Sequence, residues 1–178
     1  MIRLRLATAE DVDWLVELYG ADDVDPFLGK RRPHDAAAMG EEIERSQREP
    51  EVFGRLVIDV DGERAGTLGY HQVSEPNGIV RLEALAVHPD FRGRRVADEA
   101  ARLVQRHLIF ELGYHRIELE CYGFNERAIA HAERAGFVRE GLKRKAYTRH
   151  GEWQDAVLFS LVREDLGQRE PQEMFTEA

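Results

Sequence analysis

The residues with the clearest chemical potential form the segment HPDFRGRRVADEA, at positions 88–100. Where a strand ends and a helix begins within a few residues, the free backbone N–H groups of the first helical turn point at one place, and the helix dipole favours an anion there. Gly93 lets the backbone approach a ligand because it has no Cβ. The segment therefore predicts a phosphate site, although basic turns also precede helices that bind nothing.

A carboxylate stands shortly before this turn. Glu83 lies in the apolar run RLEALAV, at positions 81–87, which leads into the basic segment. A carboxylate beside an anion site can accept a proton from a reacting group, directly or through water. The other interpretation is structural, with Glu83 as a cross-strand partner of Arg81 or Arg116. The residues alone leave both open.

The elements that carry these residues follow from apolar periodicity. The run 81–87 is a predicted strand ended by Pro89, residues 96–112 have small and apolar side chains at helical spacing, and 115–122 alternates as a strand. A strand, a helix and a strand in this order predict a right-handed parallel crossover. Asn125 can cap a helix that runs through Ala135, and Gly136 can end it in the left-handed conformation.

The rest of the chain supplies further strands and two more helices. The other expected elements are a strand at 2–6, a helix at 10–19 opened by a near capping box of Thr8 and Asp11, a loop at 20–33, a helix at 34–47, strands at 51–60 and 65–73 around the turn Asp61-Gly62, a strand from Phe137, a turn near His150-Gly151 and a strand at 156–162. The order β-α-α-β-β-β-α-β-α-β-β predicts a single α/β domain with a mixed, mostly antiparallel twisted sheet flanked by helices.

Composition narrows the class of protein. The chain has 178 residues, 43% of them hydrophobic, which predicts one domain at 1–166 followed by a polar tail at 167–178. Its 34 acidic and 25 basic residues give a net charge of -9, which argues against nucleic-acid binding. A single cysteine, Cys121, excludes an internal disulfide, and no histidine spacing suggests a metal. Without a long apolar run or a signal peptide, we expect a soluble, cytoplasmic protein that does not bind membranes.

Three segments together resemble one family. The runs LEALAVHPDFRGRRVADEAARLV, NERAIAHAERAGFVREG and GEWQDAVLFSLVREDL are similar, in order and spacing, to the GNAT N-acetyltransferase superfamily, close to its ribosomal-protein N-terminal and polyamine branches. The likeness spans roughly residues 80–166, and the amino-terminal half matches only in element order. It implies the GNAT fold and transfer of an acetyl group from acetyl-CoA, as co-substrate, to a primary amine by direct attack in a ternary complex.

The resemblance also assigns donor-binding roles. The family signature maps onto 92–97, whose backbone N–H groups would hold the pyrophosphate, while Val87 would pair with the pantetheine arm. A strand distortion near Ala86 would free an amide to polarise the thioester carbonyl. Asn125 would lie near the pantetheine or the adenosyl group, although a helix cap explains it equally well. The full set implied is Leu85, Ala86, Val87, Arg92, Gly93, Arg94, Arg95, Val96, Ala97 and Asn125.

The chain departs from the family pattern at three positions. Arg95 replaces the first motif glycine, Asp98 stands where relatives often carry Ser or Thr, and Ala132 stands where many have a tyrosine that donates to the thiolate. A positive φ at position 95 would disfavour arginine by about 1 kcal/mol or more, whereas a helical φ would accept it. We expect Arg95 to compensate the charge of Asp98 and to contact a phosphate.

Candidates for the transfer step follow from the chemistry that it needs. Glu83 is the expected proton acceptor, and Tyr122, Tyr147 and His131 are candidate replacements for the missing acid, each equally explained by packing or exposure. We expect Cys121 to be a buried small hydrophobe and not a nucleophile.

The acceptor and the assembly are less well defined. An acidic rim could steer a cationic small-molecule or peptide amine, although a solvated helix surface explains the same residues. These are Glu10, Asp11, Asp13, Glu17, Asp22, Asp23 and Asp25. A homodimer is compatible with the sequence. The rival hypothesis, prompted by Arg95, Asp98 and Ala132, is a non-catalytic GNAT-shaped domain that binds acyl-CoA, or nothing, and serves as a sensor or assembly module.

Overall fold

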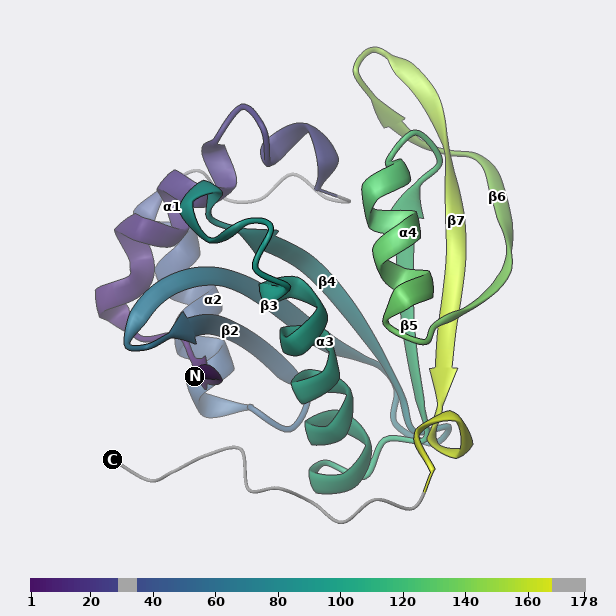
Figure 1. Ribbon diagram of the computed structural model, residues 1–178, viewed down its shortest axis with the longest axis horizontal. Helices are drawn as coiled ribbons and strands as arrows, with labels where there is room; N and C mark the ends of the chain where they lie inside the picture. The colour runs from purple at the N-terminus through teal and green to yellow at the C-terminus, as the bar shows by residue number, and fades with distance from the viewer. Residues whose placement is uncertain (29–34, 168–178) are drawn as a thin grey trace.

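A seven-stranded sheet runs through the protein and carries helices on both faces (Figure 1). The computed structural model describes residues 1–28 and 35–167. The sheet has the order β1-β2-β3-β4-β5-β7-β6. Its strands are β1 (Ile2–Leu6), β2 (Phe53–Val60), β3 (Glu63–Ser74), β4 (Ile79–Val87), β5 (Arg116–Tyr122), β6 (Val138–Arg149) and β7 (Glu152–Val162). The α-helices are α1 (Val12–Gly20), α2 (Ala36–Arg48), α3 (Val96–Arg106) and α4 (Glu126–Arg134).

Each face of the sheet has its own apolar core. On β2, Leu56 and Ile58 pack in one cluster with residues of α3 and α4, whereas Val57 belongs to a second cluster with residues of α1 and α2. Successive side chains of a strand point to opposite faces. The helix pairs α1–α2 and α3–α4 therefore cover opposite faces of the sheet, as Figure 1 shows.

The predicted pairing is confirmed. All neighbouring strands are antiparallel except β4 and β5, which are parallel and joined through α3. The two hairpin turns have positive φ at both central residues: 52° and 88° at Asp61 and Gly62, and 56° and 76° at His150 and Gly151. Such turns match the twist of the flanking strands, and small or polar residues adopt them at low cost.

Several element boundaries differ from the prediction. The helix expected at 96–112 is α-helical only to Arg106 and continues as a π turn at His107–Glu111, closed by the bond from Leu112 N–H to His107 O at 3.0 Å. The expected loop at 20–33 contains the end of α1 and a short 3-10 turn at Asp25–Phe27. Residues 29–33 of that loop, the first residue of the helix expected at 34–47 and the tail from residue 168 lie outside the described residues.

β4 and β5 separate soon after they meet. They pair only at Ile79–Arg81 with Arg116–Glu118, and beyond these residues β4 follows β3 while β5 follows β7 (Figure 1). β4 also carries a bulge, because Thr67 pairs with Ala86 and Gly69 pairs with Glu83. The single residue Leu68 thus opposes both Ala84 and Leu85. Ala84 adopts a left-handed φ of 57°.

A buried ion pair fixes the start of the first helix. The capping box of Thr8 and Asp11 is formed as predicted, with Thr8 N–H donating to Asp11 Oδ2 at 2.8 Å. The Arg5 guanidinium donates to both Asp11 oxygens, at 2.7 and 2.9 Å. Burial opposes ionisation of Asp11, but the bonds from Arg5 and Thr8 outweigh it and hold the pKa of Asp11 below its ordinary value.

Among the described residues, no helix is long and apolar enough to span a membrane.

Replacement of this carboxylate tests its role in stability. Asp11→Asn removes the charge that both partners stabilise, so we expect unfolding by urea at pH 7 to show a loss of about 2 kcal/mol. Because the folded state lowers the pKa of Asp11, its contribution is present above the unfolded value of about 3.9 and disappears as the pH falls through the folded value. The deficit should therefore shrink below about pH 4. Asp13→Asn, at an exposed position of α1, is the matched control.

Candidate functional site

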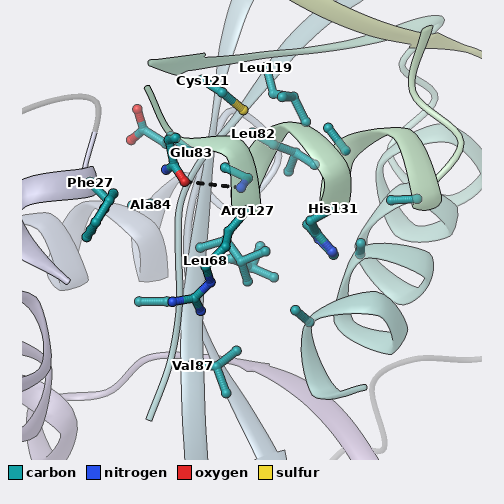
Figure 2. A pocket seen from close by; sticks show the side chains of 18 of the residues that line it. Phe27, Leu68, Leu82, Glu83, Ala84, Val87, Leu119, Cys121, Arg127 and His131 are labelled. Atoms are coloured by element: carbon teal, nitrogen blue, oxygen red, sulfur yellow. Dashed lines mark hydrogen bonds between the residues drawn. The ribbon is translucent and has the colours of Figure 1, made fainter. Parts of the chain in front are cut away.

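A cavity of about 580 Å³ opens where β4 and β5 diverge. α3 and α4 form one side of it, and the segment between α1 and α2 forms another with Asp23, Val24, Phe27 and Leu28. Figure 2 shows Leu82, Cys121 and His131 among the side chains around it. Eight predicted site residues line it: Glu83, Leu85, Ala86, Val87, Arg92, Ala97, Tyr122 and Asn125. The remaining predicted donor residues, 93–96, lie in the adjoining loop.

The loop at 92–97 has the shape of an anion cradle. Gly93 has a φ of 75°, and a Cβ built there meets no atom within 4 Å, so the space over the loop is open. Arg95 is left-handed, with φ 57° and ψ 22°, and it directly precedes α3. The first N–H groups of α3 have no acceptor within the helix. Arg95 thus has the left-handed backbone conformation that a glycine would adopt with less strain.

The partners of Asp98 differ from the expected one. Asp98 Oδ1 lies 2.9 Å from His131 Nδ1 and 3.4 Å from Arg134 Nη2, both on α4. Burial disfavours the carboxylate, but these bonds outweigh it and lower the pKa of Asp98. Burial also lowers the pKa of His131, although the Asp98 carboxylate opposes this shift. Asp98 therefore links α3 to α4, and its compensation by Arg95 is not needed.

Arg92 already binds a carboxylate. Its Nε donates to Val87 O at 3.0 Å, and its Nη1 contacts Asp23 Oδ2 in a short ion pair. The hydrogen bond from Arg92 lowers the pKa of Asp23. The Asp23 carboxylate thus pairs with the Arg92 guanidinium at the edge of the cradle. The positive charge of Arg92 is therefore already balanced by an acid of the protein.

Glu83 belongs to a charged network that crosses the sheet. Its Oε1 lies 3.9 Å from Arg55 Nη2, and its Oε2 lies 3.4 Å from His71 Nδ1. The fully buried Arg55 also donates to Glu42 Oε2 at 2.6 Å and to Tyr19 Oη at 3.2 Å. Glu83 thus does have cross-strand neighbours, Arg55 on β2 and His71 on β3.

The two arginines proposed as alternative partners of Glu83 bind other acids. Arg81 pairs with Glu118 and Glu120, and Arg116 pairs with Glu118 and Glu140. These ion pairs leave Glu83 to the Arg55 network. Arg55 is a charged residue within the apolar strand FGRLVIDV, and this exception was a signal that the sequence analysis missed. Nothing in the sequence singled out His71 as its neighbour.

The two predicted tyrosines have different surroundings. Tyr122 lines the cavity, and burial raises the pKa of its hydroxyl group. Tyr147 lies outside the cavity wall and donates its hydroxyl to Glu120 Oε2, which raises the pKa of Tyr147. The two rings meet edge to face with their centroids 6.3 Å apart. Tyr122 is therefore the tyrosine that can reach a ligand in the cavity.

Three other expectations concern packing and capping. Asn125 Oδ1 accepts the Ala128 N–H at 3.1 Å, so the predicted helix cap is formed, and Asn125 also lines the cavity. Ala132 is buried in the cavity wall. Cys121 is buried, and its burial raises the pKa of the thiol to about 12, which makes it a poor nucleophile at neutral pH.

Comparisons with known proteins agree with this architecture. The family model of the acetyltransferase (GNAT) domain matches residues 2–138. An SPbeta prophage-derived uncharacterized N-acetyltransferase, YokL, of Bacillus subtilis strain 168 is 30% identical over 134 residues, which cover 75% of each chain.

Two solved structures share the fold. RimJ of Mycobacterium smegmatis, in complex with CoA-disulfide, has a TM-score of 0.81 at 22% identity and covers 94% of this chain and 84% of its own. Spermidine N-acetyltransferase of Vibrio cholerae, in complex with CoA and spermine, has a TM-score of 0.81 at 17% identity and covers 92% of this chain and 96% of its own.

The left-handed backbone at Arg95 leads to a prediction about the stability of the fold. Arg95→Gly removes a strain of about 1–2 kcal/mol and adds backbone freedom to the unfolded chain that costs about 0.5–1 kcal/mol. We expect a net gain of up to about 1 kcal/mol in the free energy of unfolding. Arg94→Gly is the control, since Arg94 is not left-handed and glycine there only adds freedom. Equal effects of the two substitutions would contradict the strain argument.

Proposed function

The chain belongs to the GNAT acetyltransferase family and is an acetyl-CoA-dependent N-acetyltransferase, and from this premise we propose that it acetylates a primary amine by direct attack in a ternary complex. The amine nitrogen forms a bond to the thioester carbonyl carbon, the carbon–sulfur bond breaks, the amine loses a proton and the departing thiolate gains one. The observation that carries the proposal is that a proton acceptor, a strand bulge and an anion cradle border one cavity.

The donor side is assigned to the cradle and the bulge. We assign the pyrophosphate to the N–H groups at 92–97, with Arg92 and Arg95 adding charge, because the loop is open and Arg92 already binds an oxyanion. We assign the thioester carbonyl to an amide of the bulge, since Ala84 and Leu85 have no separate partners in the register with β3. The Tyr19 hydroxyl donates to Ala84 O at 3.4 Å and helps to fix this conformation.

The acceptor proton is assigned to Glu83. Its carboxylate is largely buried and lies 3.9 Å from the Arg55 guanidinium, within the cavity. An ionised carboxylate can take the proton of the attacking amine, directly or through one water. His71 lies 3.4 Å from the other oxygen of Glu83 and is partly exposed, so it offers a route for that proton to solvent.

The thiolate proton is assigned to Tyr122. This ring lines the cavity, whereas Tyr147 is held by Glu120 outside it. A hydroxyl whose pKa is raised remains protonated at neutral pH and can donate. Tyr147 then acts as a packing neighbour of Tyr122.

The rival binding module is less well supported. Its motivation was the altered residues Arg95, Asp98 and Ala132. The backbone at Arg95 keeps the left-handed conformation, and Asp98 is neutralised by α4. Two of the three departures therefore leave the cradle intact, which favours an active enzyme.

Thiol release with a panel of primary amines tests the function, and Glu83→Gln tests the proton acceptor. The glutamine keeps the shape but cannot accept a proton, so we expect kcat to fall about 100-fold or more at pH 7. The deficit should shrink toward pH 10, where the free amine is increasingly neutral in solution. The Kd of acetyl-CoA, measured by calorimetry, should not change.

Glu118→Gln is the matched control, because this β5 carboxylate lies outside the cavity wall and pairs with Arg81 and Arg116. It should leave kcat within a factor of about two of the unmodified enzyme. If acetyl-CoA raises the melting temperature but no amine is acetylated, the binding module is correct. If Glu83→Gln retains full activity, another group accepts the proton.

Arg95 also makes a prediction about donor affinity. If its guanidinium contacts a phosphate, Arg95→Gly should weaken acetyl-CoA binding about 5- to 10-fold, corresponding to about 1–1.4 kcal/mol. Arg95→Lys, which retains a positive charge, should recover part of this affinity. Binding is measured by calorimetry at low salt. Tighter binding by Arg95→Gly would show that the arginine hinders the cradle.

A further inference from the structure

We propose that the acceptor is a monoamine that carries an aromatic ring, bound at an aromatic subsite at the mouth of the cavity. The subsite consists of Phe27, Tyr122, Phe124, Tyr147 and His150. The inference rests on the proposed function, because it names the class of amine that this same cavity would receive. It narrows the cationic amine expected from the acidic rim to one that carries a single amine and an aromatic ring.

The rings of the subsite come from three separate parts of the chain. Tyr122 and Phe124 stack with their centroids 5.0 Å apart and their planes at 13°. Phe27 approaches Phe124 at 6.1 Å, and His150 approaches it from the hairpin at 5.6 Å. These spacings are those of favourable aromatic pairs. The rings thus form one continuous apolar surface.

Part of this surface is open to a ligand. Phe27 is 44% exposed and Phe124 is 39% exposed, although both are large apolar side chains. Phe27 and Tyr122 also line the cavity that holds Glu83, and Figure 2 shows Phe27 and Glu83 toward the same end of it. An aromatic ring on these side chains would therefore place an attached amine in the cavity near the proton acceptor.

Contacts from Arg149 and His150 hold the subsite together. Arg149 donates to Asp25 Oδ2 at 3.1 Å and also to the Asp25 backbone carbonyl, while His150 Nε2 lies 3.2 Å from Pro26 O. These contacts join the β6–β7 hairpin to the segment that carries Phe27. The rings are positioned by this connection before a ligand arrives, which lowers the ordering cost of binding.

The charges of the rim argue against a polyamine. A polyamine needs several carboxylates along its length, but three acids of the predicted rim already have basic partners. Asp23 pairs with Arg92, and Asp25 pairs with Arg149. Asp11 is buried beneath Arg5 and Arg64. Glu83, with Arg55 and His71 beside it, offers the cavity one carboxylate for one amine, and the neighbouring surface suits an apolar ring.

A substrate comparison tests this proposal with the full chain. Initial rates are measured with acetyl-CoA and four acceptors: 2-phenylethylamine, n-hexylamine, a tripeptide that begins with phenylalanine, and spermidine. We expect kcat/KM for 2-phenylethylamine to exceed that for n-hexylamine and spermidine by about 10-fold or more, from one additional aromatic contact. The tripeptide shows whether the ring is presented by a small molecule or by a peptide N-terminus.

Two substitutions locate the effect. Phe27→Ala and Phe124→Ala should each raise KM for 2-phenylethylamine about 5- to 10-fold and raise KM for n-hexylamine much less, because only the first substrate has a ring to lose its contact. Trp153→Ala is the control, because Trp153 is 64% exposed on β7 and does not line the cavity. Thermal melting confirms that each variant is folded.

Ligand binding separates this inference from the proposed function. Saturation-transfer NMR detects contact of the 2-phenylethylamine ring with the protein in the presence of CoA, without any reaction. If the ring contacts the protein and Phe27→Ala abolishes this contact, the subsite exists. If the same protein acetylates no amine, the proposed amine acetylation is refuted although the subsite is retained. A preference for spermidine, or ring binding that neither phenylalanine substitution changes, would overturn the inference.

Discussion

The site depends on how little β4 and β5 pair. Three residue pairs join these parallel strands, and beyond them each strand follows a different antiparallel neighbour. Separating two neighbouring strands leaves their backbone N–H and C=O groups without hydrogen-bond partners, which costs free energy. Here it creates the cavity, and the bulge at Ala84 and Leu85 forms part of the cavity wall. The cradle lies at the end of the same strand, so the position of the donor site follows from the path of β4.

A buried charge determines the acceptor side. Arg55 is fully buried in β2, and its Nε has no hydrogen-bond partner among the described residues. A buried guanidinium is stable only where acids and hydroxyl groups surround it. Glu42, Tyr19 and Glu83 supply them from α2, α1 and β4. The need to neutralise one arginine thus brings three elements to the place where an amine would lose its proton.

Local rules predicted most of the fold. The turn residues Asp61-Gly62 and the cap at Asn125 are decided by neighbours in the sequence, and both formed as expected. The π turn after Arg106 was not predicted, because it depends on packing between distant segments, whereas the strand distortion that the resemblance implied near Ala86 is the bulge at Ala84 and Leu85. The same reason applies to the site. Cradle and cavity positions followed from the motif, but the His131 partner of Asp98 belongs to another helix and leaves no local signal.

One short segment connects the two halves of the site. Asp23 binds Arg92 at the cradle, and Phe27, four residues later, belongs to the aromatic subsite. A phosphate bound at the cradle would compete with the Asp23 carboxylate for the Arg92 guanidinium, because both are oxyanions. Release of Asp23 would loosen one anchor of the segment, while Arg149 would still hold it at Asp25. Donor binding and the placement of Phe27 are therefore coupled through these residues, and the strength of the coupling is limited by the free energy of one partly exposed ion pair.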